Sequence, residues 1–319
     1  MDFIVCCRST KGADFGDDVG TVRHLAIPNT EKTHKPVNQL GLKTWINDVT
    51  AVAETGHNAV SGNPEGDVLF FVHGYNMSAT DVLRRHRLLR AGLEAQGYQG
   101  AVVSFDWPSG TVAAAYLVDR EKADRSAYKL VSGAIEPFVR FNDPVRCDVK
   151  VHVLAHSMGA YVTREAFDKA DDTAEPSSKN WSVSQLMFCG ADVSSDSMGP
   201  SDSSKSLYLH SVRVTNYYNR HDAVLSISGA KRIGISPRAG RIGLPDSAPS
   251  KAVDIDCSDY YDTHRDEFDA VPNKDHTFYF ADKVWMQDLH ETIKGDRDRL
   301  AFETRVMRGG RLNLKAPAP

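Results

Sequence analysis

A serine lies at the centre of the pentapeptide AHSMG (residues 155–159), between the apolar run Val149–Leu154 and a segment with helical spacing. This is the small-x-Ser-x-small pattern of a nucleophile elbow, with Ala155 in place of the usual first glycine. At a sharp strand-to-helix turn the serine is presented to substrate, and only small residues fit two positions to either side. The turn also directs backbone N–H groups and the positive end of a helix at the reacting centre. The pattern therefore predicts that Ser157 is a nucleophile.

A second motif, HGYN (residues 73–76), directly follows the apolar run Val68–Val72. A loop of this kind after an early strand often supplies one N–H of an oxyanion hole. We expect the N–H groups of Tyr75 and Met158 to be the two donors, each typically worth about 3 kcal/mol of transition-state stabilisation. His73 and Asn76 of the same loop are candidates for contacts with the substrate.

A nucleophilic serine needs an acid and then a histidine further along the chain. Asp222 follows the run VRVTNYY and has the usual position of the acid, whereas Asp192 follows the preceding strand candidate. We therefore favour Asp222, and Asp192 remains the alternative.

The base has two candidates after the last expected strand. His276 lies in KDHTFYF just before a C-terminal helical segment, and His264 lies in the charged run DTHRDEFD. We favour His276, which would take the proton of Ser157 and return it to the leaving group. The acid would hold the imidazole tautomer and stabilise the imidazolium.

Short apolar runs and helical segments alternate along the chain, as expected for βαβ units with a mostly parallel sheet covered on both faces. The strongest strand candidates are Val68–Val72, Ala101–Phe105, Val149–Leu154 and Ser184–Cys189, and the weaker ones are Phe3–Cys7, Val212–Tyr217 and Ala252–Asp256. Helical spacing is found from Ser78 to Gly97, Ser126 to Phe141, Gly159 to Lys169 and Val284 to Ile293.

Composition excludes several classes of function. The chain has 319 residues, 41% of them hydrophobic, and a net charge of −4, so no overall basic field attracts nucleic acid. The five cysteines are an odd number without C-x-x-C spacing, which favours reduced thiols. We expect no cofactor and no metal, because dinucleotide, P-loop and metal-ligand motifs are missing. Neither a membrane span nor a signal segment is evident, so we expect a cytoplasmic protein.

Several motifs in order resemble a bacterial alpha/beta-hydrolase family of unknown function. They are FFVHGYN (70–76), SFDWPSG (104–110), YLVDR (116–120), LAHSMG (154–159), NYYNRHDAVLSIS (216–228) and HTFYF (276–280). The resemblance implies an alpha/beta-hydrolase fold and the triad Ser157, Asp222 and His276. The elbow is also similar to that of small bacterial lipases, which favours carboxylic esters as substrates. Asp106 and Trp107 would line the floor of the site or the acyl pocket, unless they serve only to cap a turn and fill the core.

We therefore expect one alpha/beta-hydrolase domain over residues 1–307. Loop insertions are expected near residues 110–125, 194–205 and 229–251, followed by a flexible tail over 308–319. The expected activity is hydrolysis of a small ester, with short or medium acyl groups. A thioesterase, amidase or acyltransferase could use the same residues, and a non-catalytic binding protein with this fold is the alternative of another class. The sequence does not indicate an oligomeric state.

Overall fold

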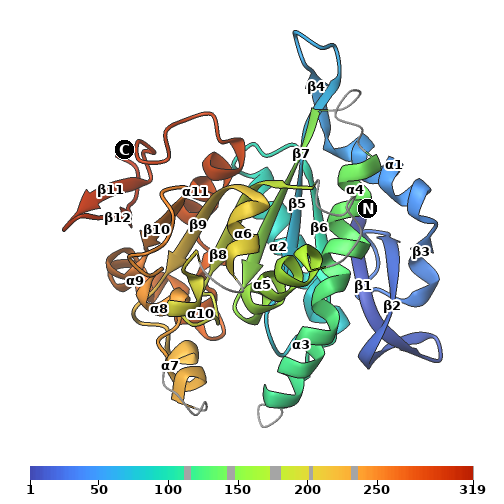
Figure 1. Cartoon of the computed structure of the whole chain (residues 1–319), viewed down its shortest axis with the longest axis horizontal. Coiled ribbons are helices and arrows are strands. Elements are labelled where there is room, and N and C mark those ends of the chain that lie inside the picture. The colour runs from blue at the N-terminus through green and yellow to red at the C-terminus, as the bar shows by residue number, and fades with distance from the viewer. Residues whose placement is uncertain (111–115, 142–147, 173–180, 201–203, 231–235, 319) are drawn as a thin grey trace.

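The computed structural model describes residues 1–110, 116–141, 148–172, 181–200, 204–230 and 236–318. Its strands form one twelve-stranded sheet in the order β11-β12-β10-β9-β8-β7-β5-β6-β1-β2-β3, with β4 paired to β5 (Figure 1). The eight neighbouring strands from β12 to β1 are all paired in parallel. The pairs at the two ends of the sheet are antiparallel. This arrangement confirms the expected mostly parallel sheet.

The strand bounds are β1 (Asp2–Lys11), β2 (Asp14–Ile27), β3 (Gln39–Leu40), β4 (Glu54–His57), β5 (Pro64–Val72), β6 (Ala101–Asp106), β7 (Asp148–His156), β8 (Val183–Cys189), β9 (Ser211–Tyr218), β10 (Ala252–Asp256), β11 (Arg305–Arg308) and β12 (Arg311–Leu314). The helix bounds are α1 (Leu42–Ala53), α2 (Ala79–Glu94), α3 (Tyr116–Leu130), α4 (Glu136–Phe141), α5 (Met158–Asp171), α6 (Lys205–Leu209), α7 (Ala223–Ala230), α8 (Ala239–Ile242), α9 (Ser258–His264), α10 (Lys274–Thr277) and α11 (Lys283–Lys294). All seven runs expected to be strands lie within these strands.

Helices cover both faces of the sheet, so its central strands are buried (Figure 1). One core joins α1, α3 and α5 to one face, with the side chains of Trp45, Ala127 and Phe167 among its members. A second core joins α2, α9 and α11 to the other face through residues such as Leu89 and Trp285. Burial on both faces explains why the central strands have continuous apolar sequences.

The boundaries of α2 and α11 follow from local hydrogen bonding. Ser78 caps α2 by accepting from the N–H of Asp81, whose side chain accepts in turn from the N–H of Ser78. At the end of α11, Gly295 adopts a left-handed φ of 66°, which glycine tolerates best. The helix expected over Ser126–Phe141 is instead part of α3, a π-helical segment at Val131–Ile135 and α4.

The expected flexible tail over 308–319 contains an ordered strand. Strand β12 pairs in parallel with β10, and Leu312 and Leu314 are buried. Behind this edge, the guanidinium of Arg305 donates to both carboxylate oxygens of Asp288 on α11, and neither side chain has any exposed surface. A buried ion pair therefore joins the end of the chain to the preceding helix.

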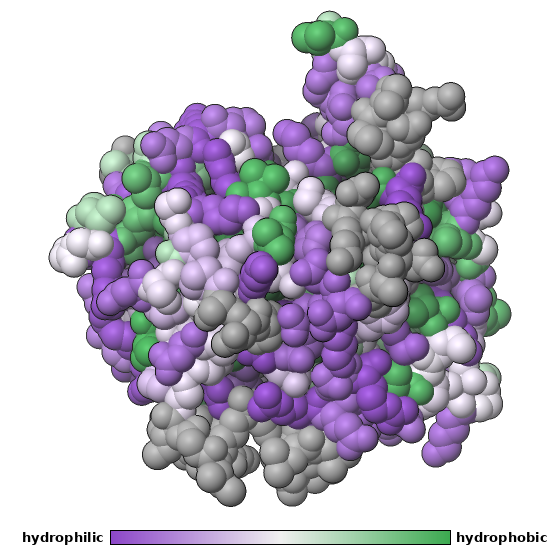
Figure 2. Space-filling model, in the orientation of Figure 1, coloured by the Kyte–Doolittle hydropathy of each residue, from purple (hydrophilic) through white to green (hydrophobic). Residues whose placement is uncertain are grey.

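Hydrophilic residues cover most of the face shown in Figure 2, and its hydrophobic residues form small, separated patches. In the described ranges, no helix combines the length and the apolar character that a membrane crossing requires. Cys6, Cys7, Cys189 and Cys257 are buried and free, and Cys147 lies outside the described residues. Residues 111–115, in the first part of the insertion expected near residues 110–125, also lie outside them.

Replacing Asp288 with Asn leaves the buried guanidinium of Arg305 without its counter-ion. We expect the free energy of unfolding, measured by urea denaturation, to fall by about 3–5 kcal/mol. The control is Glu291→Gln on the same helix, whose carboxylate faces Lys294 at 3.9 Å near the surface. That change should cost less than about 0.5 kcal/mol. Equal effects of the two variants would contradict this account of the C-terminal edge.

Candidate functional site

The candidate side chains meet at one edge of the sheet because the parallel strands end there. The HGYN loop follows β5, Ser157 follows β7, and residues 190–192 follow β8. Asp222 lies after β9, and His276 lies on α10, after β10. Segments far apart in the sequence therefore supply a single site.

Ser157 occupies a strained turn between β7 and α5. Its φ of 56° and ψ of −126° lie outside the backbone regions that residues other than glycine usually adopt. The turn is held because the N–H of Ser157 donates to the carbonyl of Cys189, and its own carbonyl accepts from Asp192 and Ala160. This geometry confirms the strand-turn-helix context that the pentapeptide predicts.

Two glycines allow neighbouring backbones to approach this turn. A Cβ on Gly159 would lie 2.3 Å from the carbonyl oxygen of Val72 in β5. A Cβ on Gly74 would lie 2.7 Å from the Cβ of Ser157. The HGYN loop therefore lies directly against the serine, as the sequence predicts.

His276 and Asp222 form a buried pair. The Nδ1 atom of His276 lies 2.6 Å from Oδ2 of Asp222, and Oδ1 accepts from the N–H of Leu225 at 2.9 Å. Burial lowers the pKa of His276, but the negative charge and hydrogen bond of Asp222 outweigh it and raise that pKa above its ordinary value. The carboxylate thus fixes the ring so that Nε2 is the atom left for proton transfer.

His156, the residue before the serine, contacts both the backbone and the ring of His276. Its Nε2 donates to the carbonyl oxygen of His276 at 3.0 Å, and the two ring centroids are 4.6 Å apart. Burial and the neighbouring His276 lower the pKa of His156 well below its ordinary value, so this ring is neutral. The sequence around His156 does not predict this role, because only contacts made by the folded chain reveal it.

The alternative acid and base have other partners. Asp192 pairs with the buried guanidinium of Arg238 at 3.2 Å. His264 bonds to the carbonyl of Tyr260 and stacks on that ring, and it is not among the residues that line the pocket beside Ser157. The geometry therefore favours Asp222 and His276 over these alternatives.

Arg238 belongs to the region 229–251, which we expected to be a long surface loop. Residues 231–235 lie outside the described residues, but Arg238, Ala239 and Gly240 are buried. The N–H of Gly240 donates to the carbonyl of Ala191, and a Cβ on Gly240 would lie 2.1 Å from the N of Ala191. This part of the region therefore supports the residues that follow β8.

The HGYN loop is oriented by His73. Its Nδ1 donates to the carbonyl of Gly74 at 2.8 Å. Because the N–H and C=O of a trans peptide point in opposite directions, this bond turns the N–H of Tyr75 away from His73. Asn76, with a φ of 59°, continues the turn. His73, Tyr75 and Asn76 all line the pocket.

Asp106 and Trp107 do not line the floor of the site, contrary to one of the two expectations. Both have no exposed surface, and neither lines the pocket. The indole of Trp107 stacks on His73 with centroids 5.5 Å apart, and its Nε1 donates to the carbonyl of His73. Oδ1 of Asp106 lies 3.1 Å from Nε2 of His73. These two residues contact the HGYN loop through His73 and do not line the pocket.

Asp106 is the centre of a buried polar network. Nε of Arg8 lies 2.8 Å from both of its oxygens, and Nη2 of Arg8 donates to the carbonyl of Met77, which follows the HGYN loop. Burial raises the pKa of Asp106, but Arg8, His34 and His73 outweigh it and hold that pKa well below its usual range. The carboxylate is therefore ionised and ties the loops after β5 and β6 together.

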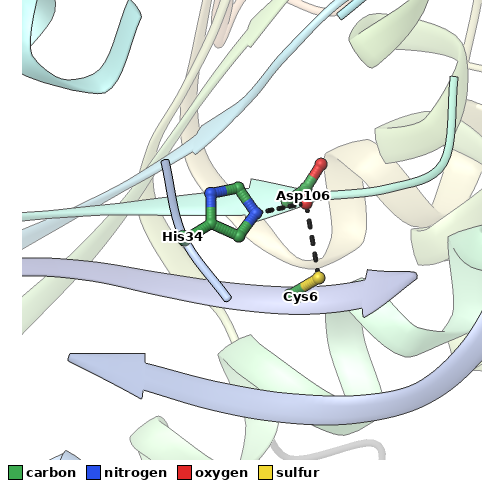
Figure 3. A group of neighbouring side chains, drawn as sticks. All are labelled: Cys6, His34 and Asp106. Carbon is green, nitrogen blue, oxygen red and sulfur yellow. Dashed lines mark hydrogen bonds and ion pairs between the residues drawn. The ribbon is translucent and has the colours of Figure 1, made fainter. Parts of the chain in front are cut away.

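Cys6, His34 and Asp106 also form a group of potential metal ligands whose atoms lie within 4.8 Å of one another (Figure 3). Nε2 of His34 and Sγ of Cys6 are both directed at Asp106, at 2.7 and 3.3 Å. A cation at this point would face the guanidinium of Arg8, which already engages both carboxylate oxygens. The donor set is thus better explained as hydrogen bonding to a buried carboxylate.

A pocket of about 690 Å³ opens above the serine. Its reactive side is formed by Ser157, His276, His156 and the HGYN loop. The rest of the wall is largely apolar and includes Phe71, Leu88, Val224, Val271 and Phe280, with Arg84, Arg85 and Asp81 contributed by α2. The dimensions suit a small organic molecule.

The family described as "Alpha/beta hydrolase of unknown function (DUF900)" matches residues 50–253, which is more than half of the chain. The chain belongs to this family. The match spans β5, the HGYN loop, the elbow and Asp222 but ends before His276. No curated protein matches the sequence.

Solved structures with similar folds are distant. An esterase from the archaeon Pyrobaculum calidifontis is 12% identical with a TM-score of 0.36, and the match covers 80% of this chain and 91% of the esterase. A cutinase-like protein from Cryptococcus sp. is 12% identical with a TM-score of 0.33, covering 76% and 97%. Phospholipase PlaB from Legionella pneumophila is 15% identical with a TM-score of 0.29, covering 65% of this chain but only 41% of the phospholipase.

Replacing Gly74 with Ala tests the close contact between the HGYN loop and Ser157. The added methyl would overlap the Cβ of Ser157, so we expect the free energy of unfolding to fall by about 1–3 kcal/mol. The matched control is Gly41→Ala, where the added Cβ meets nothing within 4 Å and φ is −66°. Denaturation of both variants in urea would measure this, and a stable Gly74→Ala protein would contradict the packing described.

Proposed function

We propose that this hydrolase-fold protein is a serine hydrolase that cleaves carboxylic esters through an acyl-enzyme. One observation carries the proposal: a serine on a strained strand-to-helix turn shares a pocket with a histidine whose ring is held by a buried carboxylate. This is the arrangement that activates a serine hydroxyl for attack on an acyl carbon.

In the proposed reaction, Nε2 of His276 accepts the proton of Ser157 as the hydroxyl oxygen attacks the acyl carbon. Asp222 stabilises the imidazolium that forms. The imidazolium then protonates the leaving alcohol, and a water activated by the same ring hydrolyses the acyl-enzyme.

The N–H groups of Tyr75 and Met158 are the proposed donors to the oxyanion. Support for Tyr75 comes from the His73 bond to the carbonyl of Gly74, which turns the following N–H away from His73, and from the contact of Gly74 with Ser157. Met158 is the first residue of α5, where backbone N–H groups lack partners within the helix. His73 and Asn76 stay proposed contacts for the substrate, because both line the pocket.

The pocket favours small substrates. About 690 Å³ of space with an apolar wall accommodates a short or medium acyl group. Thioesters, amides and acyl transfer would use the same residues, since the triad does not choose the leaving group. A binding protein without activity is less well supported, because each catalytic role has a residue in suitable surroundings.

Labelling with a fluorophosphonate probe tests the nucleophile. We expect the wild-type chain to be labelled and Ser157→Ala to remain unlabelled, since the phosphorus is attacked by the activated hydroxyl. Ser195→Ala provides a control, because Ser195 is buried away from the pocket and bonds to the carbonyl of Gly243. Labelling that persists in Ser157→Ala would overturn the assignment.

Asp222→Asn and Asp192→Asn, compared on a p-nitrophenyl ester, test the acid. We expect kcat of Asp222→Asn to fall by roughly 10⁴-fold, because the neutral amide no longer holds the tautomer. Asp192→Asn should lose stability, since Arg238 loses its partner, yet keep most of its turnover. The reverse result would reassign the acid to Asp192.

The pH profile adds a second readout for the same pair. Only the neutral His276 accepts a proton, so kcat/KM should fall as the pH decreases through the pKa of this group. Asp222 raises that pKa, which places the midpoint above the ordinary histidine value of about 6.5. In Asp222→Asn the lowering effect of burial remains, so the midpoint of the residual activity should move to lower pH.

A further inference from the structure

The guanidinium of Arg85 lies in the wall of the pocket. Arg85 projects from α2 over the ring of Phe280, with its Cζ 4.1 Å from the ring centroid, and it lines the pocket. Among the described residues, no carboxylate lies within 4 Å of its nitrogen atoms. Burial lowers the pKa of Arg85 to about 10, so the group is still charged at neutral pH.

The neighbouring charges of Asp81 and Arg84 on α2 pair with each other and not with Arg85. Asp81 is the only carboxylate among the described residues that line the pocket. It accepts from the hydroxyl of Ser78 at 2.6 Å and pairs with Arg84 at 3.2 Å. The α2 side of the pocket therefore carries a net positive charge that resides on Arg85.

Arg85 is also close to the reactive end of the pocket. Phe280, which carries the guanidinium on its face, meets His156 edge to face with centroids 5.1 Å apart, and His156 packs against His276. The positive charge of Arg85 contributes to lowering the pKa of His156. The electrostatic field of Arg85 thus acts on His156, the residue next to Ser157.

We infer that the pocket selects esters that also carry a negatively charged carboxylate or phosphate, and that Arg85 binds this group. An apolar wall, including Phe71, Leu88 and Val271, lies in the same pocket and suits a hydrocarbon segment between the ester and the charge. A half-buried guanidinium lacking a protein counter-ion gains most from an anionic ligand that completes its hydrogen bonds. The inference rests on the proposed ester hydrolysis.

Matched pairs of esters test this preference. Mono-p-nitrophenyl adipate and its neutral methyl ester place the charge on the acyl side. For the alcohol side, p-hexanoyloxybenzoate is compared with its neutral methyl ester. The same neutral ester is the reference for p-hexanoyloxyphenyl phosphate. The two comparisons show whether the site prefers a carboxylate or a phosphate. Each pair is measured with wild type, Arg85→Gln, Arg85→Lys and Arg84→Gln, the last being the control that removes a paired charge from the same turn.

We expect the wild type to favour at least one anionic ester by about tenfold or more in kcat/KM, the contribution typical of a charged hydrogen bond. Arg85→Gln should lose the preference through a higher KM for the anionic ester, so that the ratio of kcat/KM between the anionic and the neutral ester falls to about one. Arg85→Lys should keep part of the preference, and Arg84→Gln most of it. Equal rates within every wild-type pair, or a preference that survives in Arg85→Gln, would overturn the inference.

A binding measurement separates this inference from the proposed function. Calorimetric titration of Ser157→Ala protein with the anionic esters requires no turnover. If any of the anionic esters binds Ser157→Ala and this binding weakens by about tenfold in Ser157→Ala/Arg85→Gln, the anion site is supported even if the wild type hydrolyses nothing. In that case the ester hydrolase proposal alone fails. Turnover without any preference and without Arg85-dependent binding rejects the anion site and leaves the hydrolase proposal standing.

Discussion

The close approach of two backbones where β5 and β7 end is the constraint on which the site depends. Ser157 can face the HGYN loop only because Gly159 brings α5 against the carbonyl of Val72 and Gly74 brings the loop against the serine. Any side chain at either point would separate Ser157, the proposed nucleophile, from the HGYN loop, which carries a proposed oxyanion donor. The strained φ of Ser157 is kept because hydrogen bonds to β8 and to residue 192 hold the turn from both sides.

A buried electrostatic frame maintains this approach. Arg8 on β1 joins the carboxylate of Asp106 to the carbonyl of Met77, so the strand beside β6 controls the loop after β5. His73 transmits the same constraint to the peptide between Gly74 and Tyr75. Because these groups are shielded from water, breaking one contact leaves a charge or a polar atom unsatisfied. These buried contacts therefore fix the conformation of the HGYN loop.

Sequence patterns predicted the parts of the molecule whose cause is local. Continuous apolar runs identified the central parallel strands, and AHSMG and HGYN identified the turns that follow β7 and β5. Patterns failed where long-range pairing decides the outcome: β12 is too short to be recognised without its neighbour β10, and Arg238 looks solvated until Asp192 is placed beside it. Asp106 was misjudged for the same reason, since its partner Arg8 is distant in the sequence.

The distribution of buried charge distinguishes the residues that build the fold from those that face the substrate. Asp106, Asp192 and Asp288 each meet an arginine, and Asp222 meets His276, so these carboxylates are satisfied within the chain. Within the described part of this pocket, Arg85 has only an aromatic ring beneath it, which compensates the loss of hydration in part. In contrast to these paired carboxylates, the guanidinium of Arg85 has no ion pair with any of the described residues that line the pocket. The proposed anion site accounts for this charge, since an anionic ligand would supply a counter-ion that none of the described residues provides.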